Sequence, residues 1–230
     1  MNDKSIWYLE GMDLGNILCS NKLGEHISQN EHAKKAIKKN EYIYLPEDKS
    51  ELIYFISDGR VKIGSASDDG KEIIKAILGQ GEVFGELSLI GENTRRDYAI
   101  AVEDTILCCI QSSTMKSLIK DRSSLSIFFM KIMGSKVLEM ENRLQSLVFK
   151  DSRSRIIEYL TDLVKKSGQR VGYEWVVRNF ITHQEIANLT ATSRQTVTTV
   201  LNELRTSDII TFNRKRLLVR DLDKLTGEIR

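Results

Sequence analysis

The side chains best suited to chemistry lie close together near the C-terminus. Arg194 and Gln195 each present two hydrogen-bonding groups in one plane, which suits guanine O6/N7 and adenine N6/N7 respectively. Each good bidentate pair of this kind gives about 1–3 kcal/mol of discrimination between bases. Thr198 and Thr199 follow one turn later and can hydrogen-bond to bases or phosphates. This combination predicts sequence-specific contact with double-stranded DNA.

Two short helices are expected to position these side chains. Thr182 is a good N-cap residue, and Glu185 three positions later completes a capping box. After a turn at residues 190–192, which lacks the glycine often found there, Ser193 caps a second helix. The apolar stripe of this second helix consists of Val197, Val200, Leu201 and Leu204. The pattern predicts a helix-turn-helix whose second helix enters the major groove with its first turn.

A basic β-hairpin is expected directly after the second helix. Residues 209–212 and 216–219 are rich in apolar side chains, and the turn between them contains Arg214 and Lys215. Cations at a hairpin tip suit the phosphate backbone of DNA. A helix pair alone also occurs in many protein cores, but the capping box, the polar helix start and the hairpin together predict a winged helix-turn-helix. The expected DNA contacts are Thr182, His183, Ser193, Arg194, Gln195, Thr196, Thr198, Thr199, Arg214 and Lys215.

The N-terminal half of the chain has a different pattern. Its first forty residues contain helical, amphipathic patches, whereas residues 41–110 consist of short β-rich runs separated by Gly and Asp turns. The clearest runs are residues 52–56, 60–63, 72–78 and 105–110. Short strands at roughly ten-residue intervals predict a sandwich, roll or barrel.

A long helix is expected between these two regions, because residues 125–148 contain no Pro and only one Gly. Its apolar residues recur at spacings of four and three, which is the seam of a coiled coil. The seam residues are Met133, Val137, Met140, Leu144 and Leu147. We expect the seam to form a parallel contact with a second copy of the chain; the alternative is that it packs on the β-rich region of its own chain.

Composition and charge agree with a DNA partner. Residues 1–150 contain 20 Lys and Arg against 22 Asp and Glu, whereas residues 151–230 contain 14 against 10. A basic C-terminal piece favours a partner with phosphates, although so small an excess could arise by chance. No run approaches the roughly 20 apolar residues that span a bilayer, and the N-terminus is too polar for a signal peptide. We therefore expect a cytoplasmic protein that does not enter membranes.

Four segments resemble the family of the cyclic-AMP receptor protein and the fumarate-nitrate reductase regulator, the CRP/FNR family. They are residues 181–187 and 193–197 in the helix-turn-helix, and residues 69–72 and 81–89 in the β-rich region. The resemblance implies an α+β protein: an N-terminal effector-sensing β-roll (a cyclic-nucleotide-binding-like double-stranded β-helix, residues 1–122), a dimerisation helix (residues 123–149) and a winged helix-turn-helix domain (residues 150–230).

The resemblance also implies a function. Members are homodimeric transcriptional regulators rather than enzymes, and they bind inverted-repeat promoter sites and recruit or block RNA polymerase. The recognition helix keeps the early Arg as Arg194, but it has Gln195 where Glu is common and Thr199 where cyclic-AMP receptors have Arg. We therefore expect a half-site different from the TGTGA type. Whether transcription rises or falls, and at which genes, does not follow from the sequence.

The effector segment departs further from the cyclic-AMP-binding pattern. The Gly-Glu-Leu element that holds ribose and phosphate is intact, and Arg96 aligns with the phosphate-binding Arg. However, Asp97 replaces a hydroxyl residue and would repel phosphate, while Tyr98 replaces a small residue and would crowd the pocket. We expect an effector other than cyclic AMP, such as an organic acid. The candidate effector residues are Gly85, Glu86, Leu87, Ser88, Arg95, Arg96, Asp97, Tyr98 and Met140.

Metal cofactors are not expected. An iron–sulfur sensor of this type needs about four cysteines, most of them near the N-terminus, and only Cys19 lies there. A haem sensor or a cupin-type enzyme needs histidines in the β-rich region, yet the three histidines are His26, His32 and His183. Cys108 and Cys109 fall on one expected strand, so their side chains should point to opposite faces and fill the core.

Overall fold

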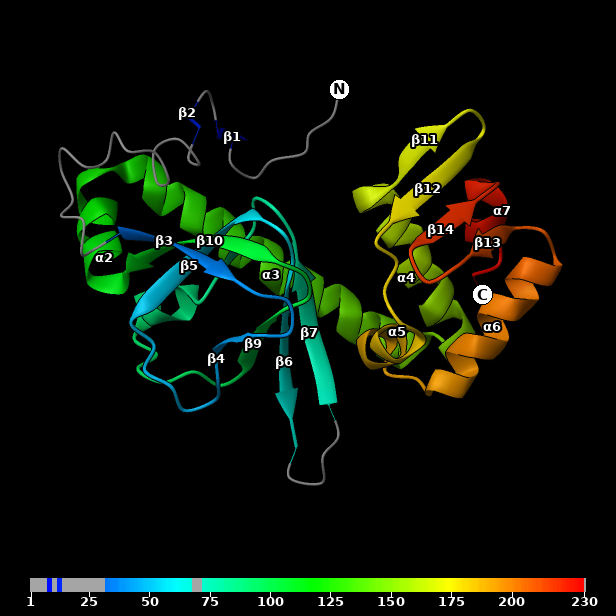
Figure 1. Ribbon diagram of the computed structural model, residues 1–230, viewed down its shortest axis with the longest axis horizontal. Helices are drawn as coiled ribbons and strands as arrows, with labels where there is room; N and C mark the ends of the chain where they lie inside the picture. The colour runs from blue at the N-terminus through cyan, green and yellow to red at the C-terminus, as the bar shows by residue number, and fades with distance from the viewer. Residues whose placement is uncertain (1–7, 10–11, 14–31, 68–71, 230) are drawn as a thin grey trace. The chain divides into compact units, whose positions relative to one another are not determined.

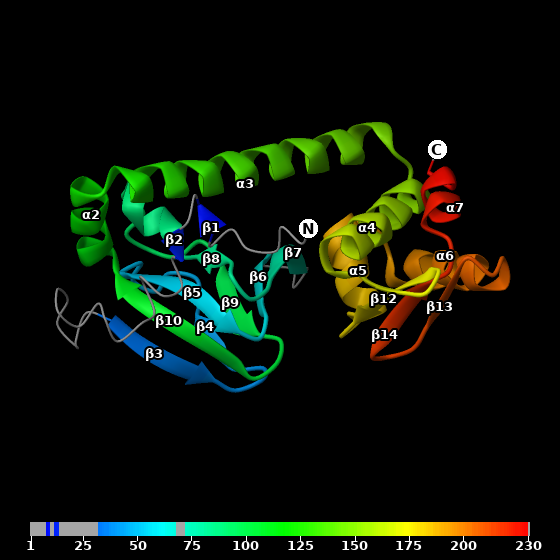
Figure 2. The same cartoon turned by 90° about the horizontal axis from the view of Figure 1, so that it is seen from above.

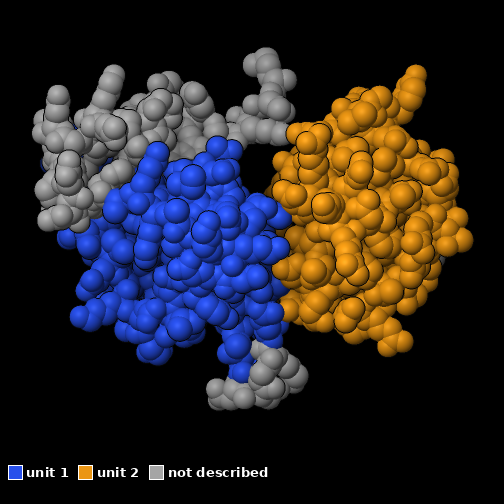
Figure 3. Space-filling view, in the orientation of Figure 1, with its two compact units in different colours: residues 1–134 blue, residues 135–230 orange. Residues whose placement is uncertain are grey.

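The computed structural model describes residues 8–9, 12–13, 32–67 and 72–229. The chain divides into two compact units, residues 1–134 and residues 135–230 (Figure 3). This division falls inside the long helix, whereas the sequence predicts domains that meet at its two ends.

The first unit contains a β-roll of two four-stranded antiparallel sheets (Figure 1). One sheet has the strand order β3-β10-β5-β8 and the other has the order β4-β9-β6-β7. The strands are β3 (His32–Ile37), β4 (Tyr42–Tyr44), β5 (Leu52–Asp58), β6 (Val61–Ala66), β7 (Glu72–Leu78), β8 (Val83–Phe84), β9 (Tyr98–Ala101) and β10 (Thr105–Gln111). A short 3-10 helix η2 (Glu86–Ile90) follows β8, and a two-residue pair β1 (Tyr8–Leu9) and β2 (Met12–Asp13) precedes the roll. The predicted β-rich architecture is confirmed.

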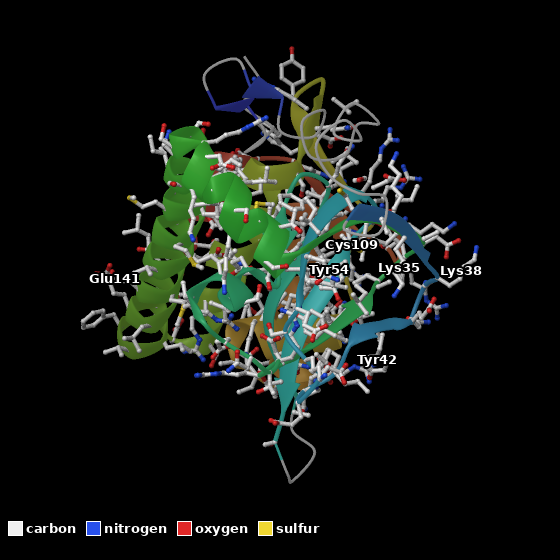
Figure 4. The ribbon with its side chains drawn as sticks, turned by 90° about the vertical axis from the view of Figure 1, so that its left-hand side faces the viewer. Lys35, Lys38, Tyr42, Tyr54, Cys109 and Glu141 are labelled. Atoms are coloured by element: carbon white, nitrogen blue, oxygen red, sulfur yellow. The ribbon has the colours of Figure 1, made fainter. Side chains whose placement is uncertain are left out.

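Among the described residues of this unit, two apolar clusters form because side chains alternate along its central strands. On β10, Cys108 faces a cluster that includes Phe55 and Phe128, whereas Cys109 faces the interior cluster that includes Leu107 and Phe84. Cys109 pairs with Tyr54 across the sheet (Figure 4). The expectation that the two cysteines point to opposite faces and fill the core is therefore confirmed.

Two expectations about local structure are wrong. The described residues before position 40 form strands rather than helices, the longest being β3. Because β3 pairs with β10, His32 belongs to the β-roll, so the roll is not free of histidine. In the second unit, residues 169–178 form a further hairpin, since a turn at Gly172, which has φ +62°, separates two strands.

Two helices follow the roll: α2 (Ser112–Asp121) and the continuous α3 (Ser123–Phe149) (Figure 2). The first turns of α3 pack against the roll through Leu125, Phe128, Phe129 and Ile132, which are all buried. No helix in the described part of the chain is long and apolar enough to cross a membrane.

The second unit combines helices with a small antiparallel sheet of strand order β11-β12-β14-β13. Its elements are α4 (Ser152–Ser167), β11 (Gln169–Val171), β12 (Glu174–Arg178), α5 (His183–Thr190), α6 (Arg194–Thr206), β13 (Ile210–Phe212), β14 (Arg216–Val219) and α7 (Leu222–Gly227). The helix α4 contributes Ile156, Ile157, Leu160 and Val164 to the core of this unit. The predicted order of two helices followed by a wing is confirmed.

Candidate functional site

The helix-turn-helix is built from the two caps that its sequence predicts. Thr182 Oγ1 accepts from the backbone N–H of Glu185 at 3.2 Å, and the Glu185 carboxylate accepts from the backbone N–H of Thr182 at 2.9 Å. Ser193 Oγ accepts from the backbone N–H of Thr196 at 3.0 Å. Reciprocal caps satisfy amide groups that a helix start otherwise leaves unpaired. Thr182, Ser193 and Thr196 thus set where α5 and α6 begin.

The turn between α5 and α6 contains a residue in the left-handed backbone conformation, and this residue is not a glycine. Ala191 has φ +50°, a conformation that is sterically unfavourable for residues other than Gly. The guanidinium of Arg155 on α4 stabilises this turn by two hydrogen bonds. Its Nε donates to the carbonyl of Thr190 at 2.9 Å, and its Nη2 donates to the carbonyl of Ala191 at 3.1 Å. Arg155 was not a predicted site residue, because its role depends on a contact between segments 35 residues apart.

The exposed face of α6 carries the predicted base-reading side chains. Val197, Val200, Leu201 and Leu204 are buried, whereas Arg194, Gln195 and Thr199 are exposed on the opposite side. Thr198 is half-buried, and its hydroxyl donates to the carbonyl of Arg194 at 2.9 Å. Thr198 would have to give up this hydrogen bond to contact another molecule. The other three predicted base-reading side chains, Arg194, Gln195 and Thr199, are exposed and would not.

His183, the first residue of α5, connects both helices to the wing. Because Thr198 uses its single hydroxyl proton on Arg194, the 2.9 Å contact between His183 Nδ1 and Thr198 Oγ1 assigns the ring proton to Nδ1. The imidazole also lies edge-on to Phe212 of the wing, with ring centroids 5.7 Å apart. Burial, followed by the charge of Arg194, lowers the pKa of His183, so the ring is neutral at pH 7. The structure thus gives His183 a positioning contact beside the helix start.

The wing presents its cations on a turn that is fixed by Asn213. The Asn213 carboxamide oxygen accepts from the backbone N–H groups of Lys215 at 2.8 Å and Arg216 at 3.0 Å. Arg214 and Lys215 are exposed at the tip. This Asx turn was not predicted, although an Asn before two cations in a hairpin is a recognisable signal for one.

In the β-roll, the structure divides the predicted effector residues between two environments. Two of them contact Tyr44 in the interior: Arg95 lies over its ring at 4.5 Å, and Asp97 accepts from its hydroxyl at 3.2 Å. Burial and the neighbouring carboxylates raise the pKa of the Tyr44 hydroxyl far above its usual value. Asp97 also forms an ion pair with Lys75 at 3.1 Å.

Arg96 and Tyr98 lie apart from this interior group. The guanidinium of Arg96 is 77% exposed and pairs with Glu92, so it points to solvent. The Tyr98 hydroxyl donates to Glu72, and its ring lies so close to Gly64 that a Cβ there would overlap the hydroxyl oxygen. The expectation that Arg96, Asp97 and Tyr98 share one pocket is therefore not what the structure shows.

The Gly-Glu-Leu element begins at a tight turn. Gly85 has φ +76°, and a Cβ at this position would lie 2.8 Å from Arg95 Nη1. The carbonyl of Gly85 accepts from Arg95 Nη1 at 3.1 Å and from Ser88 Oγ at 3.0 Å. Glu86 and Ser88 are buried, whereas Leu87 is partly exposed. Residues 69–71 of the other family-like segment lie outside the described residues.

The predicted dimer seam is largely exposed on the single chain. Val137, Met140, Leu144 and Leu147 are 63%, 72%, 63% and 42% exposed, whereas Met133 is half-buried. A second row follows the same spacing of three and four and is exposed throughout: Ile127, Met130, Gly134, Val137, Glu141, Leu144 and Val148. Glu141 lies on the outer side of α3 (Figure 4). The sequence concealed this row because a Gly and a Glu interrupt its apolar pattern.

Among the described residues, no group of three or more His, Cys, Asp or Glu is placed to hold a metal ion. Cys19 and His26 lie outside the described residues.

Comparisons with known proteins identify both units. The sequence model of the Cyclic nucleotide-binding domain matches residues 34–122, and that of the Crp-like helix-turn-helix domain matches residues 154–227. A Global nitrogen regulator of Synechococcus elongatus is 30% identical over 88% of this chain and 89% of its own. A Cyclic AMP receptor protein of Thermus thermophilus is 30% identical over 78% of this chain and 80% of its own.

The fold of this chain is also similar to those of solved structures. A CooA variant from Carboxydothermus hydrogenoformans has a TM-score of 0.78 and 26% identity, covering 98% of this chain and all of the other. FixK2 from Bradyrhizobium japonicum has a TM-score of 0.75 at 20% identity, covering 85% of this chain and 96% of the other. The chain therefore belongs to the CRP/FNR family of DNA-binding transcriptional regulators.

Proposed function

We propose that the protein is a cytoplasmic homodimer, without enzymatic activity, that binds inverted-repeat promoter DNA under the control of a small molecule and acts on RNA polymerase. The observation that carries the DNA side is the exposed row of Arg194, Gln195 and Thr199 on a helix that is capped at its start and flanked by a basic wing. Two such helices separated by one DNA turn, about 34 Å, would read successive major grooves.

Replacing Arg194 by alanine is expected to weaken specific DNA binding by about 1–3 kcal/mol and to relax preference at one base pair, because a bidentate contact to guanine is lost. Sites selected by wild-type protein from a random DNA pool provide the specific target, and unrelated DNA of equal length provides the reference. Fluorescence anisotropy measures both affinities. An equal loss on the two DNAs would show that Arg194 contacts phosphate only, and a wild-type protein that selects no sequence would refute the proposed DNA-binding function.

For the signal, we propose an effector other than cyclic AMP. The cation that aligns with the phosphate-binding Arg points to solvent, while the carboxylate of Asp97 faces the roll interior. Interior Arg95, in contrast, has a buried Nε without a hydrogen-bond partner among the described residues. A buried unpaired donor favours a ligand that brings an acceptor atom, such as the carboxylate of an organic acid.

Isothermal titration of the purified dimer with cyclic AMP is expected to show no binding up to millimolar concentration, because Asp97 repels phosphate and Arg96, which aligns with the family's phosphate-binding Arg, points to solvent. A panel of small mono- and dicarboxylic acids, titrated under the same conditions, forms the second arm. Micromolar binding of cyclic AMP would contradict this proposal and would leave the proposed DNA-binding function intact.

A further inference from the structure

One face of the C-terminal half of α3, which belongs to the second unit, makes polar contacts with α4 and α5 of the same unit. Residues at spacings of four, three and four share a helix face. These residues and their contacts are Glu139 with Lys166 at 3.5 Å, Arg143 with the carbonyl of Leu189 at 2.8 Å, Ser146 with Glu158 at 2.6 Å, and Lys150 with Glu158. The exposed apolar row, which includes Val137 and Leu144, lies on another side of the same helix. The same stretch of α3 therefore offers a surface for a second chain and a polar attachment to the DNA-binding unit.

Arg143 is the member of this face that contacts the helix-turn-helix itself. Its Nη2 donates to the carbonyl of Leu189, in the last turn of α5. The last four carbonyls of a helix have no partner within the helix, and cations are favourable beside them. Burial lowers the pKa of Arg143, but a guanidinium keeps its charge in proteins.

The next two carbonyls along the chain are held by a second guanidinium. Arg155 on α4 bonds to Thr190 and Ala191, and its Nη1 donates to the carbonyl of Lys150 at 2.9 Å, just after α3 ends. Two arginines thus hold three consecutive carbonyls at residues 189–191, immediately before the cap that starts the recognition helix. The left-handed Ala191 lies within this segment, so its backbone is kept in place by these bonds.

We propose that Arg143 is a positioning residue for DNA binding: it couples the placement of the dimer helix α3 to the start of the recognition helix α6. A rotation or slide of α3 moves the Arg143 guanidinium away from Leu189 and releases one side of the held turn. Arg155, which is anchored on α4 and on the end of α3, then holds the turn alone. The coupling adds to the proposed function, because it names a route by which a shift of α3 changes DNA affinity.

The test compares Arg143→Gln and Arg143→Lys with Lys131→Gln, which removes one exposed cation from α3 without touching the turn. DNA affinity, its salt dependence and the dimer dissociation constant are measured for each full-length variant, together with amide hydrogen exchange at residues 187–193. We expect Arg143→Gln to weaken specific DNA binding about 10-fold or more, to speed exchange at these residues, and to leave dimer affinity within twofold. Arg143→Lys should recover part of the loss, and Lys131→Gln should match wild type.

The salt dependence separates positioning from direct contact. A side chain that bonds a DNA phosphate contributes about one to the slope of log affinity against log salt. Arg143→Gln should therefore keep the wild-type slope. A slope lower by about one, a DNA affinity within twofold of wild type, or exchange at residues 187–193 identical to wild type would each overturn the proposal. A wild-type protein that selects no DNA would instead refute the proposed function, and the exchange data would still decide whether Arg143 holds the turn.

Discussion

Replacing Arg95 by alanine is expected to lower the unfolding free energy of the β-roll by roughly 2–5 kcal/mol, whereas Arg96→Ala changes it by less than about 0.5 kcal/mol. Arg95 is only 4% exposed and donates to the carbonyls of Gly85 and Leu52. Its guanidinium also stacks over the rings of Tyr44 and Tyr54, at 4.5 and 5.6 Å from their centroids. Alanine removes all of these contacts, and the Gly85 carbonyl then keeps only its hydrogen bond from Ser88 Oγ.

The neighbouring residue provides a matched control. Arg96 has the same side chain and lies one position away, but it is largely exposed, and exposed ion pairs contribute little to stability. Urea denaturation gives the overall stability, and amide exchange on β5 and β10 reports the roll separately from the DNA-binding unit. If Arg96→Ala lowered the unfolding free energy as much as Arg95→Ala, or more, the buried guanidinium of Arg95 would not be what stabilises the roll.

The contrast between these arginines shows where sequence reasoning fails in the effector site. Alignment to a family pattern selects Arg96 by counting positions, but adjacent residues in an extended chain point to opposite sides. Which of two neighbouring arginines enters the interior depends on the path of the chain between η2 and β9. That path is set by contacts distant in sequence, such as Glu47 N–H to the carbonyl of Arg95.

The helix-turn-helix was predictable because its determinants are local. A capping box spans four residues and an Asx turn spans three, so both can be recognised in a sequence, although only the capping box was predicted. The contacts of Arg143 and Arg155 were not visible, because they join residues 46 and 35 positions apart.

The strand β3 was missed for a different reason. Within the described part of the chain it is an edge strand that pairs with β10 alone, and two of its exposed positions are lysines, of which Figure 4 shows Lys35. Charged residues on an edge strand discourage pairing with other chains but also remove the apolar alternation that marks a strand. Among the described side chains of this strand, Ile37 is the one that packs in the interior cluster.

Two rows of residues on α3 are candidates for the dimer seam, and apolar spacing and exposure favour different rows. The sequence favours the register that contains Met140 and Leu147, whereas exposure favours the row that contains Gly134 and Glu141. Val137 and Leu144 belong to both rows. A seam residue should be exposed on the single chain, and Met133 of the first register is half-buried. Gly134 has no atom within 4 Å of an added Cβ, which leaves room for close approach of a second helix.

Leu144→Glu is expected to weaken the homodimer at least 100-fold, because it places two carboxylates in the seam in either register. Glu141→Leu separates the registers. In the exposed row it replaces a pair of facing carboxylates by apolar side chains, so the dimer should tighten at least 10-fold. If the seam is instead the row with Met140 and Leu147, Glu141 lies beside it, and Glu141→Leu should change the dimer affinity little.

Leu147→Glu provides the opposite control, because Leu147 belongs only to the row with Met140. Sedimentation equilibrium of the three variants gives the dissociation constants directly. A dimer broken by Leu147→Glu but unaffected by Glu141→Leu would establish the register that the apolar spacing favours. A dimer tightened by Glu141→Leu would show that the chain carries a repulsive charge within its own interface. In that case the stability of the dimer, and with it DNA binding, is held below what the helix could provide.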